Sequence, residues 1–322
     1  CQNVAIGTFA HCVNTTGDNN VAIGVCSLCT NTTADANVAV GFQSLYANTT
    51  GASNTAVGAY SLDANTTGAN NSAFGLNSLT SNTTGASNTG LGRSSLSTNS
   101  TGTCNVAVGN NSMLQNTTGG CNVAVGVFTL DSNTTGVQNT AVGYQSLTVS
   151  TTGGNNTAFG SYTGDSVTTG INNTLIGFNG GHTVTTGDNN TLIGNLAGTD
   201  AVRTVTTGDN NIVIGNNSSA TAHIKIDWTV TSDLRDKTEI KDVKHGLDFV
   251  NQITPIEYKF KKSREDDTPH GLTKYGFKAQ EILKLEGDNP VIINNEDIDN
   301  LKLTNSHLIP VLVNAIKELK AE

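Results

Sequence analysis

The sequence predicts an all-β body, a parallel β-solenoid built from 17-residue coils, followed by a small α+β domain. Two observations predict the solenoid: glycine recurs every 17 residues, and an Asn stands four residues before each of these glycines. A third observation separates the second domain. Residues 1–232 contain no Glu and only three basic residues, whereas residues 233–322 have the composition of a charged globular segment. We therefore expect a solenoid shaft over 1–216, a connecting strand or neck over 217–231 and a second domain over 232–322.

The repeat unit reads Asn-(Val/Thr)-Ala-(Val/Ile)-Gly-x-x-Ser-Leu-x-x-Asn-Thr-Thr-Gly-x-x. A period this strict indicates stacked copies of one small unit. Seventeen residues are too few for a helix pair, but they fit one solenoid coil of two or three short strands separated by Gly and Asn turns. The recurring glycines are Gly7, Gly24, Gly41, Gly58, Gly75, Gly92, Gly109, Gly126, Gly143, Gly160, Gly177 and Gly194, with Gly215 after an interval of 21.

Stacked coils would pair as parallel strands about 4.8 Å apart, so about twelve coils would form a rod on the order of 60 Å long. Each residue would then lie above its own equivalent. The recurring Asn is expected to form a ladder of amides that bond to the neighbouring coils, and the recurring Gly to supply corners with positive φ.

An exchange between two repeat positions predicts which side chains fill the core. Most coils have Ala two residues after the ladder Asn and Leu eight residues after it. In later coils Leu175 and Leu192 replace Ala, while Gly181 and Gly198 replace Leu. Such a reversal keeps the core volume constant, so we expect the two positions to touch.

The cysteines lie in the repeats and include two pairs at a spacing of 17, Cys12 with Cys29 and Cys104 with Cys121. Each pair would occupy one site on adjacent coils, within the Cα separation of a disulfide. We weigh a bridge in each pair, formed in an oxidising compartment, against the alternative that Cys only fills a small buried site.

Eight Asn-Thr-Thr or Asn-Ser-Thr segments are formal glycosylation sequons. A glycan on every coil would be severely crowded, so we expect a stacked turn instead. The sequon residues are Asn14, Asn31, Asn48, Asn65, Asn82, Asn99, Asn116 and Asn133.

The second domain shows helix and strand signals in a defined order. Residues 222–231 alternate like a strand, residues 246–250 suggest a short helix, and residues 254–260 a strand. The segment 308–319 predicts a terminal helix with an apolar face, a seam for partner helices. That face consists of Leu308, Leu312, Ala315 and Leu319, with Ile309 and Ile316 beside them.

The stretch Ser232-Asp233-Leu234-Arg235-Asp236-Lys237-Thr238-Glu239-Ile240 resembles the start of the intramolecular chaperone domain of phage endosialidases and tail fibres, where Ser-Asp-x-Arg-x-Lys-x-x-Ile marks an autoproteolytic site. The segments 246–250, 254–260, 275–282 and 308–319 follow that family's order. The repeats are loosely similar to the heads of trimeric autotransporter adhesins, with their Asn-x-Ala-Ile-Gly strands.

The resemblance implies a homotrimer whose chains are cut at the Ser232–Asp233 bond. It also implies that the domain is a Ser-Lys peptidase that cuts its own chain and has no external substrate, with Ser232 as nucleophile and Lys237 as base. Serine needs a base to become a nucleophile, and Lys237 can act as one only when neutral, a form that burial or positive neighbours favour. Asp236 stands where the family more often has Leu, and its carboxylate would disfavour that neutral form.

Several classes of partner are excluded. A net charge of −9 without a basic run argues against nucleic acid, and no apolar run is long enough for membrane insertion. The six histidines show no metal spacing, so neither a metal nor a cofactor is expected. Because the chain begins inside a repeat, we expect it to be a piece of a longer protein.

These observations favour a trimeric viral tail fibre or spike, on the virion surface or otherwise extracellular, that attaches to a host cell-surface glycan or another receptor. Alternatives are a bacterial surface adhesin and the shaft of a glycan-degrading tailspike. The glycan-degrading alternative is disfavoured, because glycosidases usually need two carboxylates and the solenoid has no Glu. An ice-binding solenoid is disfavoured, because adjacent Thr side chains point to opposite faces of a strand.

Overall fold

The computed structural model describes residues 2–200, 203–219, 232–261 and 264–321. The chain divides into two compact units, Cys1–Ser218 and Ser219–Glu322. The strand predicted at residues 222–231 lies outside the described residues.

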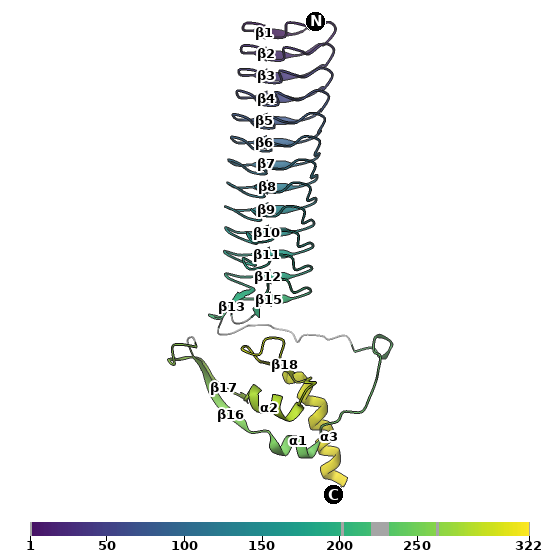
Figure 1. Cartoon of the computed structure of the whole chain (residues 1–322), viewed down its shortest axis with the longest axis vertical. Helices are drawn as coiled ribbons and strands as arrows, with labels where there is room; N and C mark the ends of the chain where they lie inside the picture. Colours follow the sequence, from purple (N-terminus) through teal and green to yellow (C-terminus); the bar gives the residue numbers. More distant parts are fainter. Residues whose placement is uncertain (1, 201–202, 220–231, 262–263, 322) are drawn as a thin grey trace. The chain divides into compact units, whose positions relative to one another are not determined.

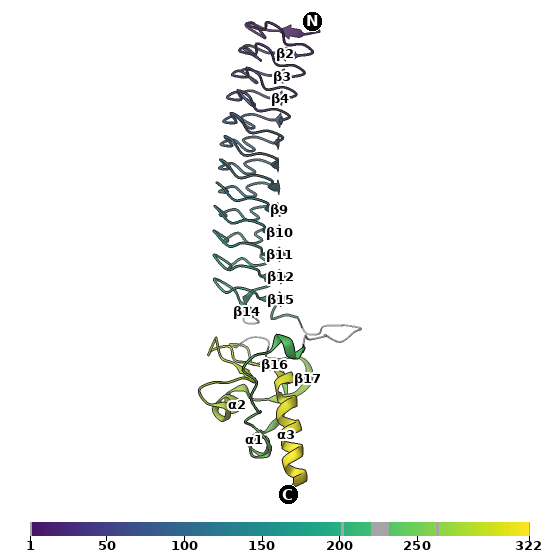
Figure 2. The same cartoon turned by 90° about the vertical axis from the view of Figure 1, so that its right-hand side faces the viewer.

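The first unit is a β-solenoid in which each coil contributes one strand, and the strands lie above one another along one side of the stack (Figures 1 and 2). They form a 13-stranded parallel sheet in chain order. The strands are β1 (Val4–Ile6), β2 (Val21–Ile23), β3 (Val38–Val40), β4 (Thr55–Val57), β5 (Ser72–Phe74), β6 (Thr89–Leu91), β7 (Val106–Val108), β8 (Val123–Val125), β9 (Thr140–Val142), β10 (Thr157–Phe159), β11 (Thr174–Ile176), β12 (Thr191–Ile193) and β15 (Ile212–Ile214).

The register confirms the stacking predicted from the period. Val106 pairs with Val123 and Ala107 with Ala124, a shift of one repeat, and the same holds from β1 to β12. The longer interval before Gly215 has a structural cause, because the coil between β12 and β15 also holds a small hairpin. Its strands are β13 (Thr199–Asp200) and β14 (Arg203–Thr204).

The expectation of two or three strands per coil is wrong for the coils that begin at β1 to β11, because each has one strand and its other sides are turns. Non-glycine residues take left-handed backbone conformations there, for example Tyr60 (φ 56°), Leu62 (φ 51°) and Asn70 (φ 61°). Their N–H groups point along the stack: that of Tyr60 donates to the previous coil and that of Leu62 to the next. These bonds between coils offset the strain of the left-handed conformation.

The core of the solenoid is two columns of side chains, as the Ala and Leu positions predict. Ala107, Leu96 and Met113, like their equivalents in the other central coils, are fully buried. The exchange in later coils is confirmed as a contact. A Cβ atom added to Gly181 would lie 2.7 Å from Cδ2 of Leu175, and one added to Gly198 would lie 2.6 Å from Cδ1 of Leu192.

Two Asn ladders connect the coils. In the predicted ladder, Oδ1 of Asn105 accepts a hydrogen bond from the backbone N–H of Asn122 at 3.0 Å, and Nδ2 of Asn105 donates to Gly119 O at 2.8 Å. The second ladder uses the sequon residues: Nδ2 of Asn116 donates to Oδ1 of Asn99 at 2.7 Å. Most of the buried amides are thereby hydrogen-bonded, as burial requires, and the exceptions are Nδ2 of Asn37 and Oδ1 of Asn133.

The same contacts show whether the sequon asparagines of the central coils are accessible for glycosylation or form a stacked turn. From Asn31 to Asn133 the sequon asparagines are fully buried, and only Asn14 in the first coil is partly accessible. Their Nδ2 atoms, to which a glycan would attach, donate within the ladder instead. The structure therefore confirms the stacked turn.

Asp131 is a half-buried acid of the solenoid for which a pH effect on stability can be predicted. Its Oδ1 has no hydrogen-bond partner, and burial raises the pKa of its carboxyl above 3.8. Because the folded state raises the pKa of this acid, it binds the proton more tightly than the unfolded chain does. Protonation of Asp131 therefore contributes to the stability of the fold. This contribution is complete below the ordinary pKa of Asp and is lost as the pH rises through the raised pKa of the folded state. We expect Asp131→Asn to raise the melting temperature at pH 7 but not at pH 3. Thermal unfolding at both values checks this, and an equal loss of stability at both would contradict it.

The described part of the second unit has three α-helices, α1, α2 and α3, a long hairpin of β16 and β17, and a small core (Figure 1). Its elements are η1 (Leu234–Asp236), α1 (Leu247–Gln252), β16 (Pro255–Lys261), β17 (Pro269–Phe277), α2 (Ala279–Glu286), β18 (Ile293–Asn294), β19 (Lys302–Leu303), η2 (Asn305–His307) and a terminal helix α3 (Leu308–Ala321). The helices and the strand predicted from the sequence are thus confirmed. The core consists of Phe249, Ile282, Ile292, Ile293, Leu308 and Val311.

Two carboxylates organise this unit. Glu318 on α3 accepts a hydrogen bond from the N–H of Leu247 at 2.5 Å, at the first turn of α1, where a negative charge is favourable. Glu286 at the end of α2 accepts the N–H groups of Val291, Ile292 and Ile293 at 2.8, 2.7 and 3.0 Å. The first contact ties α3 to α1 across 71 residues of sequence, and the second ties the end of α2 to the segment that leads into β18.

The apolar face of α3 is divided differently from the sequence prediction. Leu308 and Ala315 are buried within their own unit together with Val311, so they are not available to partner helices. Ile309, Leu312, Ile316 and Leu319 remain exposed, at alternating spacings of three and four residues. This exposed set, which we call the α3 stripe, has the spacing of a coiled-coil seam.

Candidate active site

The segment that carries Ser232 and Lys237 is folded by a capped turn. Asp233 is the N-cap of η1, and its Oδ1 accepts a hydrogen bond from the N–H of Arg235 at 2.9 Å. The guanidinium of Arg235 also donates a hydrogen bond to this carboxylate, from Nη2 to Oδ2 at 2.6 Å, and this contact lowers the pKa of Asp233. A side-chain cap and a chelated carboxylate explain why Asp and Arg follow the Ser in this motif.

The turn brings the two predicted catalytic residues together. The backbone N–H of Lys237 donates to Leu234 O at 3.2 Å and ends η1. The side chain of Lys237 then folds back along the turn. Its Nζ donates to Oγ of Ser232 at 2.8 Å and to the carbonyl oxygen of Ser232 at 3.0 Å. One amine thus contacts both the candidate nucleophile and the carbonyl of the Ser232–Asp233 bond.

This geometry permits two kinds of assistance. A neutral Lys237 could accept the Ser232 hydroxyl proton across the 2.8 Å contact, whereas a charged Lys237 polarises the carbonyl. Ser232 and Lys237 are both exposed, and water stabilises the charged amine. Exclusion of water from the Ser232–Lys237 contact would therefore favour the neutral amine, which could then act as the base for the Ser232 hydroxyl.

The cysteine pairs lie on adjacent coils as expected. The Sγ atoms of Cys12 and Cys29 are 3.1 Å apart, longer than the covalent distance of about 2.05 Å, and both thiols are free. Burial, reinforced by the contact with Cys12, raises the pKa of Cys29 to about 11. Cys104 and Cys121 are free and exposed. A bridge within either pair in an oxidising compartment stays a prediction.

Other candidate sites are modest. Among the described residues, no group of three or more His, Cys, Asp or Glu is placed to hold a metal ion. The predictions from the sequence missed one pair on adjacent coils, in which His182 Nδ1 and Asp165 Oδ1 lie 2.5 Å apart. The 17-residue spacing of this His and Asp was the signal that could have revealed it.

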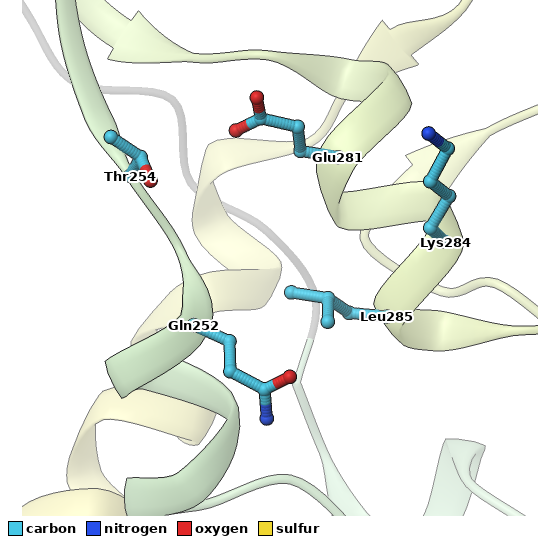
Figure 3. Close-up of a pocket in the computed structure, with 5 residues that line it drawn as sticks. All are labelled: Gln252, Thr254, Glu281, Lys284 and Leu285. Carbon is cyan, nitrogen blue, oxygen red and sulfur yellow. The ribbon is translucent and has the colours of Figure 1, made fainter.

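A shallow pocket in the second unit is separate from the dyad. It is lined by Gln252, Thr254, Glu281, Lys284 and Leu285. Figure 3 shows Leu285 extending from α2 towards the segment of Gln252 and Thr254. Glu281 is paired with Lys278 at 2.7 Å, and neither Ser232 nor Lys237 lines the pocket.

Comparison with known proteins agrees with the site. Residues 232–289 match the family model described as chaperone of endosialidase. No curated protein and no solved structure matches the chain. In the described part of the chain, no helix has the length and apolarity needed to cross a membrane. The family match and the solenoid body fit a tail-fibre- or endosialidase-type protein with a C-terminal chaperone domain, which confirms the resemblance found in the sequence.

Proposed function

Because residues 232–289 match the chaperone-of-endosialidase family, we propose that this chain forms a trimeric fibre whose C-terminal domain aligns three chains and then cuts each at Ser232–Asp233. The observation that carries the proposal is the contact of Lys237 Nζ with both Oγ and O of Ser232. The groups that the cleavage reaction would use, a candidate nucleophile, a candidate base and a polarised peptide carbonyl, lie in one exposed turn.

The α3 stripe supports assembly into a trimer. Ile316 is 65 % exposed and Leu319 is 60 % exposed in the single chain. Four large apolar side chains at heptad spacing on one helix are stabilised by burial against equivalent helices. Identical helices supply the same spacing, so copies of this chain fit the stripe.

The hairpin of β16 and β17 supports the same conclusion. It is a two-stranded sheet with few buried residues, and such a sheet is marginally stable alone. Leu272 is 72 % exposed and Tyr275 is 84 % exposed. Contacts with neighbouring chains would cover these side chains and stabilise the hairpin.

On the solenoid, the residues before the repeated glycines form an apolar column that is exposed in some coils and half-buried in the others. Ile6, Phe74, Leu91, Phe159 and Ile176 are its most exposed members among the first eleven coils. A second copy of the chain has the same repeat, so its column can meet this one coil by coil over the whole length. Three such shafts would form a fibre.

Attachment to a host is the outward function that such a fibre serves, at the virion surface or outside the cell. A run of edge-to-face aromatic pairs, Phe128–Tyr144, Tyr144–Tyr162 and Tyr162–Phe178, offers a surface for a glycan or another receptor. A bacterial surface adhesin is the alternative role for the same shaft.

Self-cleavage is tested by expressing the full chain beside Ser232→Ala and Lys237→Ala. We expect the wild-type chain to yield two fragments, Ser232→Ala to stay intact, and Lys237→Ala to be cut at least about 10²-fold more slowly, since general-base catalysis contributes that much. Denaturing gels and intact mass measurement give the result. Lys241→Ala, which alters another exposed Lys of the segment, should be cut normally. An intact wild-type chain under folding conditions would contradict the proposal.

A further inference from the structure

The position of Ser232 creates a problem for cleavage within one chain. The Oγ atom of Ser232 is separated from the carbonyl carbon of Ser232 by Cβ and Cα alone. An attack on its own carbonyl would close a four-membered ring and bend its bond angles by about 20° from their preferred values. Such a geometry is far from the aligned approach at about 3–3.5 Å that nucleophilic attack requires.

The carbonyl of Ser232 is nevertheless the one that the site activates. Lys237 Nζ donates to this oxygen at 3.0 Å, and the bond beyond it is Ser232–Asp233. The segment from Ser232 to Lys237 is exposed along its whole length, so the carbonyl can be approached from outside the chain. A nucleophile from a different chain meets no ring constraint.

We propose that the Ser232–Asp233 bond is cut in trans: Ser232 of one chain, with Lys237 of that same chain as its base, attacks the Ser232 carbonyl of a neighbouring chain. This inference rests on the proposed self-cleavage and adds the origin of the nucleophile. In a closed three-fold assembly each chain would attack once and be attacked once. A single chain would be inert, so cleavage would report that assembly is complete.

The reaction balances without a co-reactant other than water. Oγ of the attacking Ser232 bonds to the carbonyl carbon of the attacked chain, and its proton passes to the neutral Nζ of its own Lys237. The C–N bond to Asp233 of the attacked chain then breaks, and Lys237 returns the proton to the departing amine. Water hydrolyses the resulting ester, which frees Oγ and leaves a carboxylic acid at Ser232 of the attacked chain.

Mixed assemblies of full-length chains test the proposal. An N-terminally tagged Ser232→Ala chain is co-expressed with untagged wild-type chain in equal amounts, and all assemblies that contain at least one tagged chain are purified through the tag. The masses of both polypeptides are measured. Wild type alone and Ser232→Ala alone are the controls, and the new chain ends are sequenced.

In trans, about half of the tagged Ser232→Ala chains should be cut after residue 232, and about two thirds of the wild-type chains retained with them should stay whole, because neighbours are drawn at random in a cyclic trimer and trimers of wild type alone are removed by the purification. Complete cleavage of wild type with no cleavage of the tagged chain would overturn the proposal. A fragment that begins with Ser232 would also overturn the proposal. Such a fragment would show that the bond before Ser232 is cut, and Ser232 Oγ can reach the preceding carbonyl within its own chain through a five-membered ring. Wild type left whole on its own would instead overturn the proposed self-cleavage.

Discussion

Gly109→Ala is expected to destabilise the solenoid by about 3 kcal/mol or more, through strain and collision together. Gly109 has φ of 130°, a conformation that side chains rarely allow. A Cβ atom at this position would also lie 2.6 Å from the carbonyl carbon of Gly126 in the next coil. Neither backbone can retreat without breaking the register of the stack.

The effect should appear as a fall in melting temperature of roughly 6 °C or more, for a unit of this size. Gly120→Ala is the matched control, because a Cβ atom there meets only Thr103 O at 3.1 Å, and Ala52, Ala69 and Ala86 occupy the same position in other coils. Circular dichroism on both variants measures the difference. Equal melting temperatures for the two variants would show that the recurring glycine is not required by the stack.

Ile316→Glu is expected to abolish trimer assembly. In an assembled bundle the α3 stripe would bring three copies of residue 316 together, and each unpaired buried carboxylate would cost about 3 kcal/mol or more. The fold of the single unit should survive, because Ile316 is exposed, whereas the buried side of α3 is formed by Leu308, Val311 and Ala315. If cleavage follows assembly, the variant should also remain uncut.

Lys317→Glu is the control, since it adds the same residue to the adjacent exposed position outside the α3 stripe. Light scattering gives the mass of each variant, and a gel gives its cleavage. A trimeric, fully cut Ile316→Glu protein would contradict the role of the α3 stripe in trimer assembly.

The period of the repeat carried most of the information about the solenoid. A 17-residue spacing predicts parallel coils in register, and the pairing of Val106 with Val123 is its direct consequence. The exchange of Ala and Leu for Leu and Gly predicted a contact that Leu175 and Gly181 make. Volume conservation sufficed here because stacking reduces the packing problem to one repeated cross-section.

The path of each coil was not predictable from residue preferences. Tyr60 and Leu62 have left-handed backbones, which their types disfavour, and bonds between coils impose this conformation. The same fact adds a second reason for the exchange in later coils. Gly181 and Gly198 stand at the left-handed position that Leu occupies elsewhere, with φ of 66° and 76°. The sequence prediction recognised only the volume.

At the candidate site, the motif predicted the residues but not their arrangement. Ser232 and Lys237 were identified by resemblance, whereas the cap formed by Asp233 and its pairing with Arg235 emerged from the structure. The division of α3 into buried Leu308 and Ala315 and the exposed stripe was also hidden. Spacing alone cannot say which of two adjacent apolar faces packs against the helix's own domain.

The central claim, that this chain assembles as a trimer through its C-terminal domain, is tested most directly by the mass in solution of the full-length Ser232→Ala chain. This variant keeps its C-terminal domain attached under the proposed mechanism. Light scattering coupled to size-exclusion chromatography should give three times the chain mass of 33.3 kDa. A mass equal to that of one chain, at concentrations where the protein is folded, would contradict the account.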